Sequence, residues 1–235
     1  MIIVRKLREI QVFCGFFRKA RRANNTSPNL TPSSDWLPAC ELYGEGIFFS
    51  FDETKLNEWA KIPCCISRSN IVVKRLEMST FSNGLPRPSP RLILLHTISH
   101  ILIKQLEFSS GYPVSSIKEK IFCSDRNEFP MSGILIYLVV PDKMGSLGGL
   151  AEHGKPEKFL KLWLKTIEKA EYCTYDPICS EHEGQGPDQL NRAACHGCSL
   201  LPEVSCTYNN CLLDRQFITG NNKDEIQGFI KYVQQ

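Results

Sequence analysis

The central stretch of the chain reads Arg91-Leu-Ile-Leu-Leu-His-Thr-Ile-Ser-His-Ile-Leu-Ile-Lys-Gln-Leu-Glu107. Its length and its freedom from glycine and proline predict the clearest helix of the chain. Proline-rich residues 85–90 precede it, and Gly111-Tyr-Pro113 ends it. The apolar run within it is interrupted by His96, Thr97, Ser99 and His100 and is too short to cross a bilayer. The pattern therefore predicts a buried helix and no membrane span.

Strands and shorter helices are predicted on both sides of this helix. Gly133-Ile-Leu-Ile-Tyr-Leu-Val-Val140 is a continuous apolar run typical of a buried strand. Asp52 is a good N-cap for a short helix that ends near Trp59. The sequence predicts an α+β fold, with helices packed on a small mixed sheet. Further elements are expected at 47–51 (strand), 121–124 (strand), 155–170 (helix) and 224–233 (helix).

Leu85-Pro-Arg-Pro-Ser-Pro90 is a rigid, non-helical connector. The main organisational boundary is predicted there. It separates a basic, β-rich N-terminal region, residues 1–90, from a second domain, residues 91–235, which carries a cysteine-rich segment.

Composition excludes several classes of protein. Hydrophobic residues make up 42% and charged residues 23% of the 235 residues, which indicates a globular chain rather than a disordered one. The net charge of +3 excludes a polyelectrolyte. Because Arg5 and Lys6 stand where a signal peptide needs apolar residues, a cytoplasmic protein is expected.

Positive charge is concentrated near the N-terminus. A basic segment of this kind can contact a phosphate backbone, so it is a candidate nucleic-acid-binding region. A solvated arm or a protein-docking strand explains the same charges. The candidate residues are Arg5, Lys6, Arg8, Arg18, Lys19, Arg21 and Arg22.

The chain has eleven cysteines, an odd number. A disulfide framework is not expected in a reducing compartment. Five of the cysteines lie between Cys173 and Cys206, and a metal site explains this crowding most economically.

The sharpest motif in this segment is the C-x-x-C pair Cys195 and Cys198. Two thiolates at this spacing can bind one tetrahedral ion, and Cys173 and Cys179 can supply the second pair. Four thiolates leave no coordination position open, so the site predicted is a structural zinc site. Cys206 is the alternative to Cys173 as a ligand. A redox pair and unrelated buried cysteines are the competing interpretations.

His96 and His100 lie four residues apart, on one face of the predicted helix. A zinc protease would need glutamate directly after the first histidine, where this chain has Thr97. Two hydrogen-bonded histidines in an apolar helix are the simplest interpretation. A metal-dependent nuclease or hydrolase that uses both histidines is the alternative.

Several motifs together resemble the helicase-associated putative zinc-binding (MZB) domain family and, more narrowly, subunits of DISARM anti-phage systems. Each motif is weak alone, but the combination is specific. The motifs include Leu94-Leu-His-Thr-Ile-Ser-His-Ile-Leu-Ile103, Asp176-Pro-Ile-Cys179, Glu183-Gly-Gln-Gly-Pro187, Ala194-Cys-His-Gly-Cys198 and Leu212-Leu-Asp-Arg215.

The resemblance implies a cysteine-ligated zinc module in residues 91–235 that partners a superfamily 2 helicase acting on DNA. It also implies an accessory role in anti-phage defence. The chain lacks the G-x-x-x-x-G-K-[ST] phosphate loop of ATPases. We therefore expect a non-catalytic, zinc-binding subunit whose partners are a helicase and DNA. A purely structural scaffold without DNA contact is a further alternative.

Overall fold

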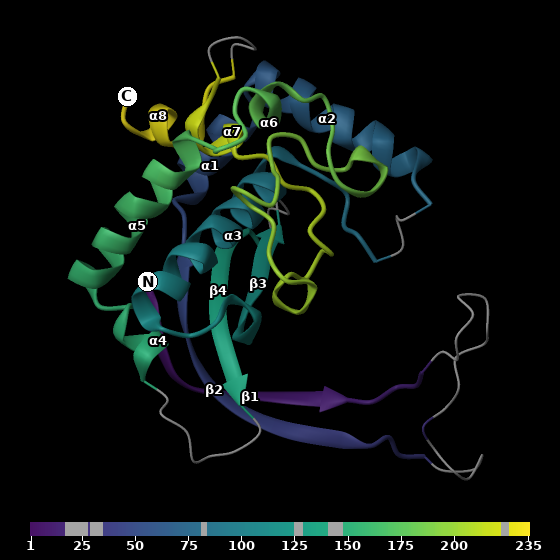
Figure 1. The fold of residues 1–235 in the computed structure, drawn as a ribbon, viewed down its shortest axis with the longest axis vertical. Helices are drawn as coiled ribbons and strands as arrows, with labels where there is room; N and C mark the ends of the chain where they lie inside the picture. The colour runs from purple at the N-terminus through teal and green to yellow at the C-terminus, as the bar shows by residue number, and fades with distance from the viewer. Residues whose placement is uncertain (17–27, 29–34, 81–83, 125–128, 141–147, 222–225) are drawn as a thin grey trace.

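The computed structural model describes residues 1–16, 28, 35–80, 84–124, 129–140, 148–221 and 226–235. The described residues form one four-stranded sheet. Figure 1 shows helices packed against part of this sheet, while the ends of β1 and β2 extend beyond them. The strands are β1 (Ile2–Val12), β2 (Ala39–Ser50), β3 (Ile117–Ser124) and β4 (Met131–Val140). The main helices are α1 (Glu53–Ala60), α2 (Pro63–Met78), α3 (Pro90–Ser110) and α5 (Pro156–Glu171). Short helices are η1 (Val114–Ser116), α4 (Gly149–Glu152), α6 (Ile178–Glu181), η2 (Pro187–Gln189), η3 (Glu203–Ser205), α7 (Gln216–Thr219) and α8 (Phe229–Val233).

The strand order is β1-β2-β4-β3, and each of these three pairings is antiparallel. The α+β class is confirmed, but the predicted mixed sheet is corrected to an antiparallel one. Neighbouring strands β1 and β2, and likewise β3 and β4, follow each other directly in the chain, and such pairs need no crossover. The backbones of β2 and β4 approach closely at Gly44, where an added Cβ would lie 1.9 Å from the Leu138 carbonyl oxygen.

Helix α3 lies across the sheet and is buried along most of its length. Ser89 caps its first turn by accepting a hydrogen bond from the Leu92 N–H, at 3.2 Å. Gly111 ends it in the left-handed conformation, with φ of 76°. The predicted helix over 91–107 is therefore confirmed. Because α3 contacts β3, β4, α5 and α7, it is the centre of the core.

The smaller helices follow the prediction in part. Asp52 caps α1 as expected, with its carboxylate 2.9 Å from the Lys55 N–H. The helix expected over 224–233 begins only at Phe229 in the described residues, because the preceding Asn221 and Ile226 pair as an isolated β-bridge. Helix α2 was not predicted.

One apolar core joins the two regions expected on either side of residue 90. Strand β2 pairs with β4, so strands from both regions share one sheet. Aromatic rings add a second link, since Phe51, which directly follows β2, packs against Trp163 of α5 and against Phe229 of α8. The boundary at residue 90 stays a prediction.

Among the helices that the structure describes, none combines the length and the apolar composition that crossing a bilayer requires.

Candidate metal centre

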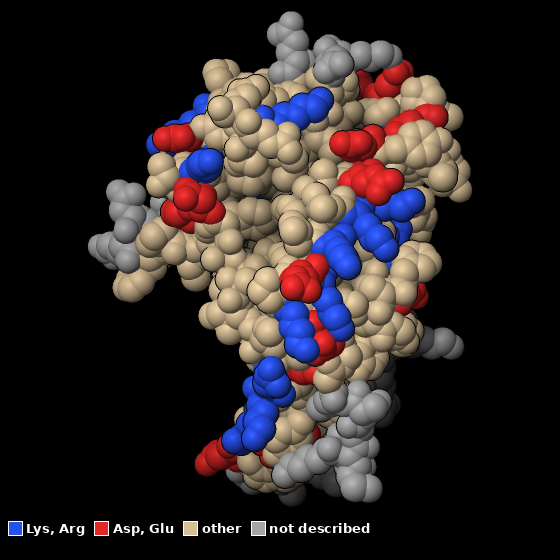
Figure 2. Space-filling view, turned by 90° about the vertical axis from the view of Figure 1, so that its left-hand side faces the viewer, with Lys and Arg blue, Asp and Glu red and all other residues tan. Residues whose placement is uncertain are grey.

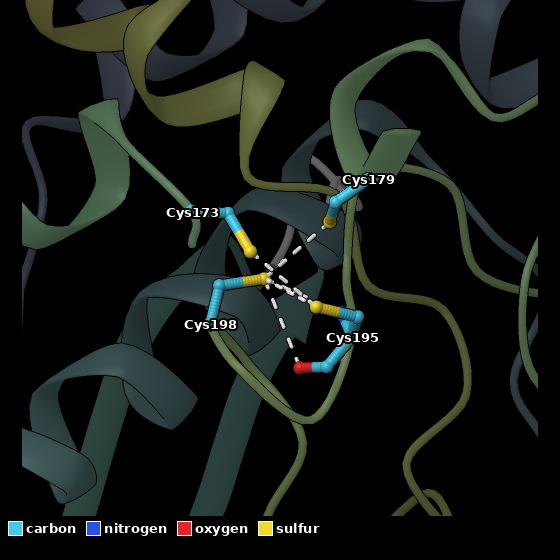
Figure 3. A group of neighbouring side chains, drawn as sticks. All are labelled: Cys173, Cys179, Cys195 and Cys198. Carbon is cyan, nitrogen blue, oxygen red and sulfur yellow. Dashed lines mark hydrogen bonds between the residues drawn. The ribbon is translucent and has the colours of Figure 1, made fainter. Parts of the chain in front are cut away.

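Four cysteine sulfurs converge beside α3 (Figure 3). The Sγ atoms of Cys173 and Cys195 are 3.4 Å apart, and that of Cys198 is 3.8 Å from both Cys179 and Cys195. A tetrahedral ion with Zn–S bonds of about 2.3 Å requires sulfurs about 3.8 Å apart. The spacing and the all-sulfur donor set therefore fit one zinc ion.

Two turns place these sulfurs. The C-x-x-C turn is closed by the Ser199 N–H, which donates to the Cys195 carbonyl at 2.8 Å. Cys173 follows the end of α5, and Cys179 lies in α6. The two pairs thus come from segments 16 or more residues apart in the chain, which only the tertiary fold brings together.

Hydrogen bonds point at the sulfurs and favour thiolates. The N–H groups of Tyr175 and Cys195 donate to Cys173 and Cys198, at 3.4 and 3.3 Å. Hydrogen bonds from the Cys179 thiol and the Ser199 hydroxyl lower the pKa of Cys198 to about 5. The same contact with Cys198, together with burial, raises the pKa of Cys179. One cysteine thus ionises easily, and a bound cation would allow the others to follow.

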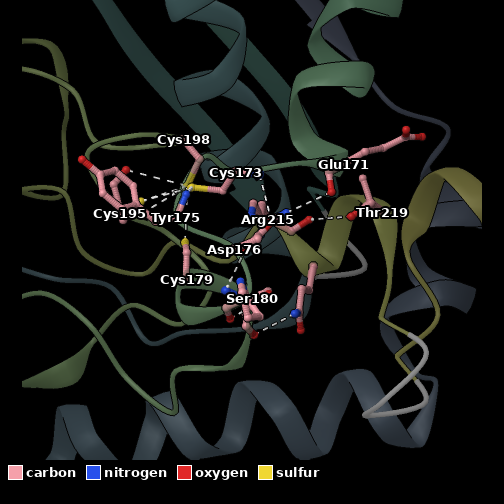
Figure 4. A network of polar contacts seen from close by, with 12 residues as sticks. Glu171, Cys173, Tyr175, Asp176, Cys179, Ser180, Cys195, Cys198, Arg215 and Thr219 are labelled. Atoms are coloured by element: carbon pink, nitrogen blue, oxygen red, sulfur yellow. Dashed lines mark hydrogen bonds and ion pairs between the residues drawn. The ribbon is translucent and has the colours of Figure 1, made fainter.

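Asp176 and Arg215 hold the first cysteine pair in place (Figure 4). The Asp176 carboxylate accepts the N–H of Cys173 at 2.9 Å and that of Ser180 at 3.1 Å. Arg215 forms an ion pair with Asp176 and also donates to the Ala170 carbonyl at the end of α5, at 3.2 Å. This network fixes the loop between Cys173 and Cys179 to the body of the domain.

The second pair is tied to α3. Lys104 of α3 donates to the His196 carbonyl at 2.8 Å, inside the C-x-x-C turn. His100, one turn earlier, contacts the Ser199 carbonyl through Nδ1 at 2.8 Å. An ion held by the four cysteines would therefore join the segment that follows α5 to the C-x-x-C turn. The hydrogen bonds from Lys104 and His100 connect that turn to α3.

The structure brings together Cys173, Cys179, Cys195 and Cys198, the set favoured by the sequence. Cys206, the alternative ligand, lies instead beside His96 and His100, in a second cluster with Glu119. The two histidines also contact backbone carbonyls, as the simplest interpretation expects. Sequence reasoning missed Glu119.

The candidate nucleic-acid residues are only partly described. Arg5, Lys6 and Arg8 are exposed on β1, and Arg8 forms an ion pair with Glu41. The other four, Arg18, Lys19, Arg21 and Arg22, lie outside the described residues.

Helix α5 carries a basic surface that the sequence analysis did not single out. Figure 2 shows Lys and Arg side chains gathered in a band along one face of the molecule. Spacings of three and four residues place five exposed lysines, one at the N-cap and four within the helix, along one side of α5; we call them the α5 lysine stripe. Glu152 pairs with the first two. The stripe consists of Lys155, Lys158, Lys161, Lys165 and Lys169.

The stripe continues toward β1. Arg5 of β1 and Lys155 line one hollow of about 280 Å³, together with Glu45 and Glu152. The helical spacing of the lysines was the signal in the sequence that could have revealed this surface.

Comparison with known families finds a match for the central part of the chain. Residues 98–199, which include the four converging cysteines, match the model of the MrfA Zn-binding domain. The region that carries the four-cysteine cluster is therefore similar to MZB domains. The resemblance inferred from the motifs is confirmed, and the MZB match together with the cysteine cluster supports a structural zinc ion.

The similarity extends beyond the MZB domain. The chain is 34% identical, over 96% of its length, to the DISARM protein DrmB of Bacillus paralicheniformis. It spans 42% of the length of that relative. The similarity to this DISARM protein therefore includes the residues that match the MZB model and the residues on both sides of them.

Proposed function

We propose that the chain is a non-catalytic, zinc-stabilised accessory subunit of a DISARM-type anti-phage system, which partners a superfamily 2 helicase and contributes to DNA binding in the cytoplasm. The observation that carries the proposal is the convergence of four cysteine sulfurs inside the region that matches the MZB model. The similarity to the DISARM protein DrmB supports the defence role.

Cys173, Cys179, Cys195 and Cys198 are the proposed zinc ligands. Bound there, the ion supplies structural crosslinking, because four thiolates leave no position for water or substrate. Cys173 and Cys179 are 2% exposed and Cys198 is 7% exposed, so three of the four donors are shielded from solvent, and Cys195 is half-buried. These features support a structural rather than a catalytic role.

Burial weighs against the alternative of a nuclease or hydrolase that uses His96 and His100. Both side chains are 0% exposed, and the carboxylate beside them, Glu119, is 3% exposed. A phosphodiester could not reach these groups without opening the core.

DNA contact is proposed for the α5 lysine stripe and for Arg5, Lys6 and Arg8 of β1. The support is geometric, since Arg5 and Lys155 line the same hollow and so join the two basic surfaces. Ammonium and guanidinium groups along one face can follow a phosphate backbone without reading bases. The expected binding is therefore salt-dependent and largely independent of sequence.

Replacing Lys161, Lys165 and Lys169 by glutamine is expected to weaken DNA binding and flatten its salt dependence. Each phosphate that a lysine no longer neutralises reduces the slope of log K against log salt by about 0.9 on duplex DNA, so three such phosphates reduce it by about 2.7. Fluorescence anisotropy with a labelled duplex, from low to moderate salt, measures the slope.

The matched control replaces Lys61, Lys74 and Lys120, which are exposed on other elements, by glutamine. It changes net charge equally and should leave most of the slope intact. Equal effects of the two triple variants would contradict a defined DNA-binding face, and an inert wild-type chain would exclude direct DNA contact.

The helicase partnership is tested by co-expression of the chain with the superfamily 2 helicase of the same defence system. We expect both proteins to elute together in size-exclusion chromatography. Separate elution at micromolar concentration, while the chain remains folded and zinc-loaded, would count against this partner.

A further inference from the structure

A second cluster of metal-ligating side chains lies in the core, between α3, β3 and the turn that follows η3. His96 and His100 come from α3, Glu119 from β3, and Cys206 from the turn. One ligand atom from each lies within 4.8 Å of every other. We propose that these four residues form a second, closed site for a divalent transition metal, and that Zn²⁺ is the ion it fits best.

The distances are those of ligands around one small ion. His96 Nε2 is 3.0 Å from Glu119 Oε1 and 3.2 Å from Cys206 Sγ, and His100 Nε2 is 3.4 Å from the same Glu119 oxygen. Tetrahedral zinc with bonds of about 2.0 to 2.3 Å has ligand atoms about 3.3 to 3.8 Å apart. Small outward shifts of these side chains would accommodate the ion.

Both imidazole rings are oriented for binding through Nε2. Nδ1 of His96 lies 3.3 Å from the Leu212 carbonyl, and Nδ1 of His100 lies 2.8 Å from the Ser199 carbonyl. A carbonyl only accepts hydrogen bonds, so each Nδ1 carries the proton and donates it. Each neutral ring therefore presents the Nε2 lone pair to the cluster, as in metal sites whose histidines are oriented by backbone carbonyls.

His100 provides the strongest sign of a missing partner. Its Nε2 is buried and has no hydrogen-bond partner among the residues that the structure describes. The nearest carboxylate oxygen, on Glu119, is 3.4 Å away. Unpartnered buried polar atoms are rare in folded proteins, and a metal ion would satisfy this one.

The two acidic ligands are held as anions. Cys206 Sγ accepts the N–H of Tyr208 at 3.3 Å and that of Asn210 at 3.2 Å. This close turn requires positive φ at Asn209 and Asn210, a conformation that asparagine tolerates. The Glu119 carboxylate accepts the Ser99 hydroxyl and, at 3.3 Å, the Thr207 N–H. A thiolate, a carboxylate and two neutral imidazoles carry a charge of −2, which a divalent cation balances.

The competing state holds two protons instead of an ion. Burial lowers the pKa of each histidine, but the Glu119 charge outweighs it and raises the pKa of both. Two imidazolium ions would then neutralise the cluster, and metal binding would have to release their protons. In that state the Nε2–H of His100 still lacks a well-placed acceptor, so the geometry favours the ion.

The site leaves no access to substrate. Both histidines are 0% exposed, Glu119 is 3% exposed and Cys206 is 8% exposed. The ligands come from the central helix, an edge strand and the cysteine-rich segment, so the ion would fasten that segment to the sheet. Its role would be structural, like that proposed for the four-cysteine site.

Metal content of the purified full chain tests the proposal. We expect two equivalents of zinc in the wild type, by inductively coupled plasma mass spectrometry after exhaustive dialysis. Cys206→Ser and His100→Gln should each retain one equivalent, and Cys198→Ser should also retain one. Cys211→Ser is the matched control, because Cys211 is buried close by in sequence but belongs to neither cluster; it should retain two.

Cobalt substitution separates the two centres spectroscopically, and the wild type alone gives the number of ions bound. A wild type refolded with Co²⁺ should bind two equivalents, with charge-transfer absorption from five thiolates. Cys206→Ser should remove about one fifth of that absorption, whereas loss of the four-cysteine site should remove most of it.

The outcomes distinguish failure of either site. One equivalent of metal in the wild type, unchanged by Cys206→Ser and lost in Cys198→Ser, overturns the second site and leaves the first. One equivalent lost only in Cys206→Ser supports the second site and removes the first. Two equivalents that neither Cys206→Ser nor His100→Gln reduces also overturn the proposal.

Discussion

Replacing Cys198 by serine is expected to lower the melting temperature by about 10 °C or more. Structural zinc contributes folding free energy directly, with apparent values of about 10 to 16 kcal/mol in small zinc-finger peptides. The cysteine-rich segment of this chain is also held by Arg215 and Asp176, so we expect a smaller loss, about 4 kcal/mol. At about 2 to 4 °C per kcal/mol for a chain of this size, that corresponds to about 10 °C.

Thermal unfolding followed by circular dichroism measures the effect. A strong chelator should shift the wild type in the same direction. It should shift Cys198→Ser less, because only the second cluster can hold an ion in that variant. Cys211→Ser alters a buried cysteine outside both clusters, and its shift should be much smaller. If Cys198→Ser and Cys211→Ser melt together, and the chelator has no effect, the four cysteines do not hold a stabilising ion.

Replacing Arg68 by methionine is the second change expected to have a large effect. Arg68 of α2 binds Asp214 through two hydrogen bonds, at 2.5 Å from Nε and 3.2 Å from Nη2. The two side chains are only 4% and 1% exposed. Removing one partner of a buried ion pair leaves an uncompensated charge and costs about 3 to 5 kcal/mol. The melting temperature should therefore fall by about 6 to 20 °C.

The double variant Arg68→Met/Asp214→Asn distinguishes this cause from a loss of packing. Asparagine removes the unpaired charge and keeps an oxygen that can accept the Gln216 N–H, which lies 3.2 Å from the carboxylate. Denaturant unfolding should show that the double variant regains much of the stability lost by Arg68→Met. A double variant less stable than the single one would show that the charge is not the cause.

The central helix and the four-cysteine cluster could be predicted because both depend on local patterns. The 91–107 stretch has apolar residues on every side of the helix, which leaves few alternatives to a buried helix. The C-x-x-C pair is a short-range signal, and a second pair nearby in the chain completes the tetrahedron. A long stretch without a helix breaker was enough in the first case, and ligand spacing was enough in the second.

Helix α2 escaped prediction because its buried face is partly polar. That face includes Arg68 and Ser69. The burial of Arg68 is explained by its ion pair with Asp214, which is 146 residues away in the sequence. Apolar periodicity alone cannot reveal such a face. Pro63 at the first helical position was the remaining local signal.

The second cluster escaped prediction for a related reason. His96 and His100 were visible as a pair, but their partners come from β3 and from the segment after η3. Glu119 lies between Ile117 and Ile121 on the buried face of β3. A single carboxylate at an apolar strand position was the signal that could have drawn attention to it.

Ser199 belongs to the surroundings of both clusters. Its carbonyl accepts from His100 Nδ1, and its hydroxyl donates to Cys198 Sγ at 3.3 Å. Ordering Ser199 for one set of ligands therefore reduces the conformational entropy that is lost when the other set assembles. The two halves of the cysteine-rich segment should accordingly fold as one cooperative unit, although each set of ligands holds its own ion.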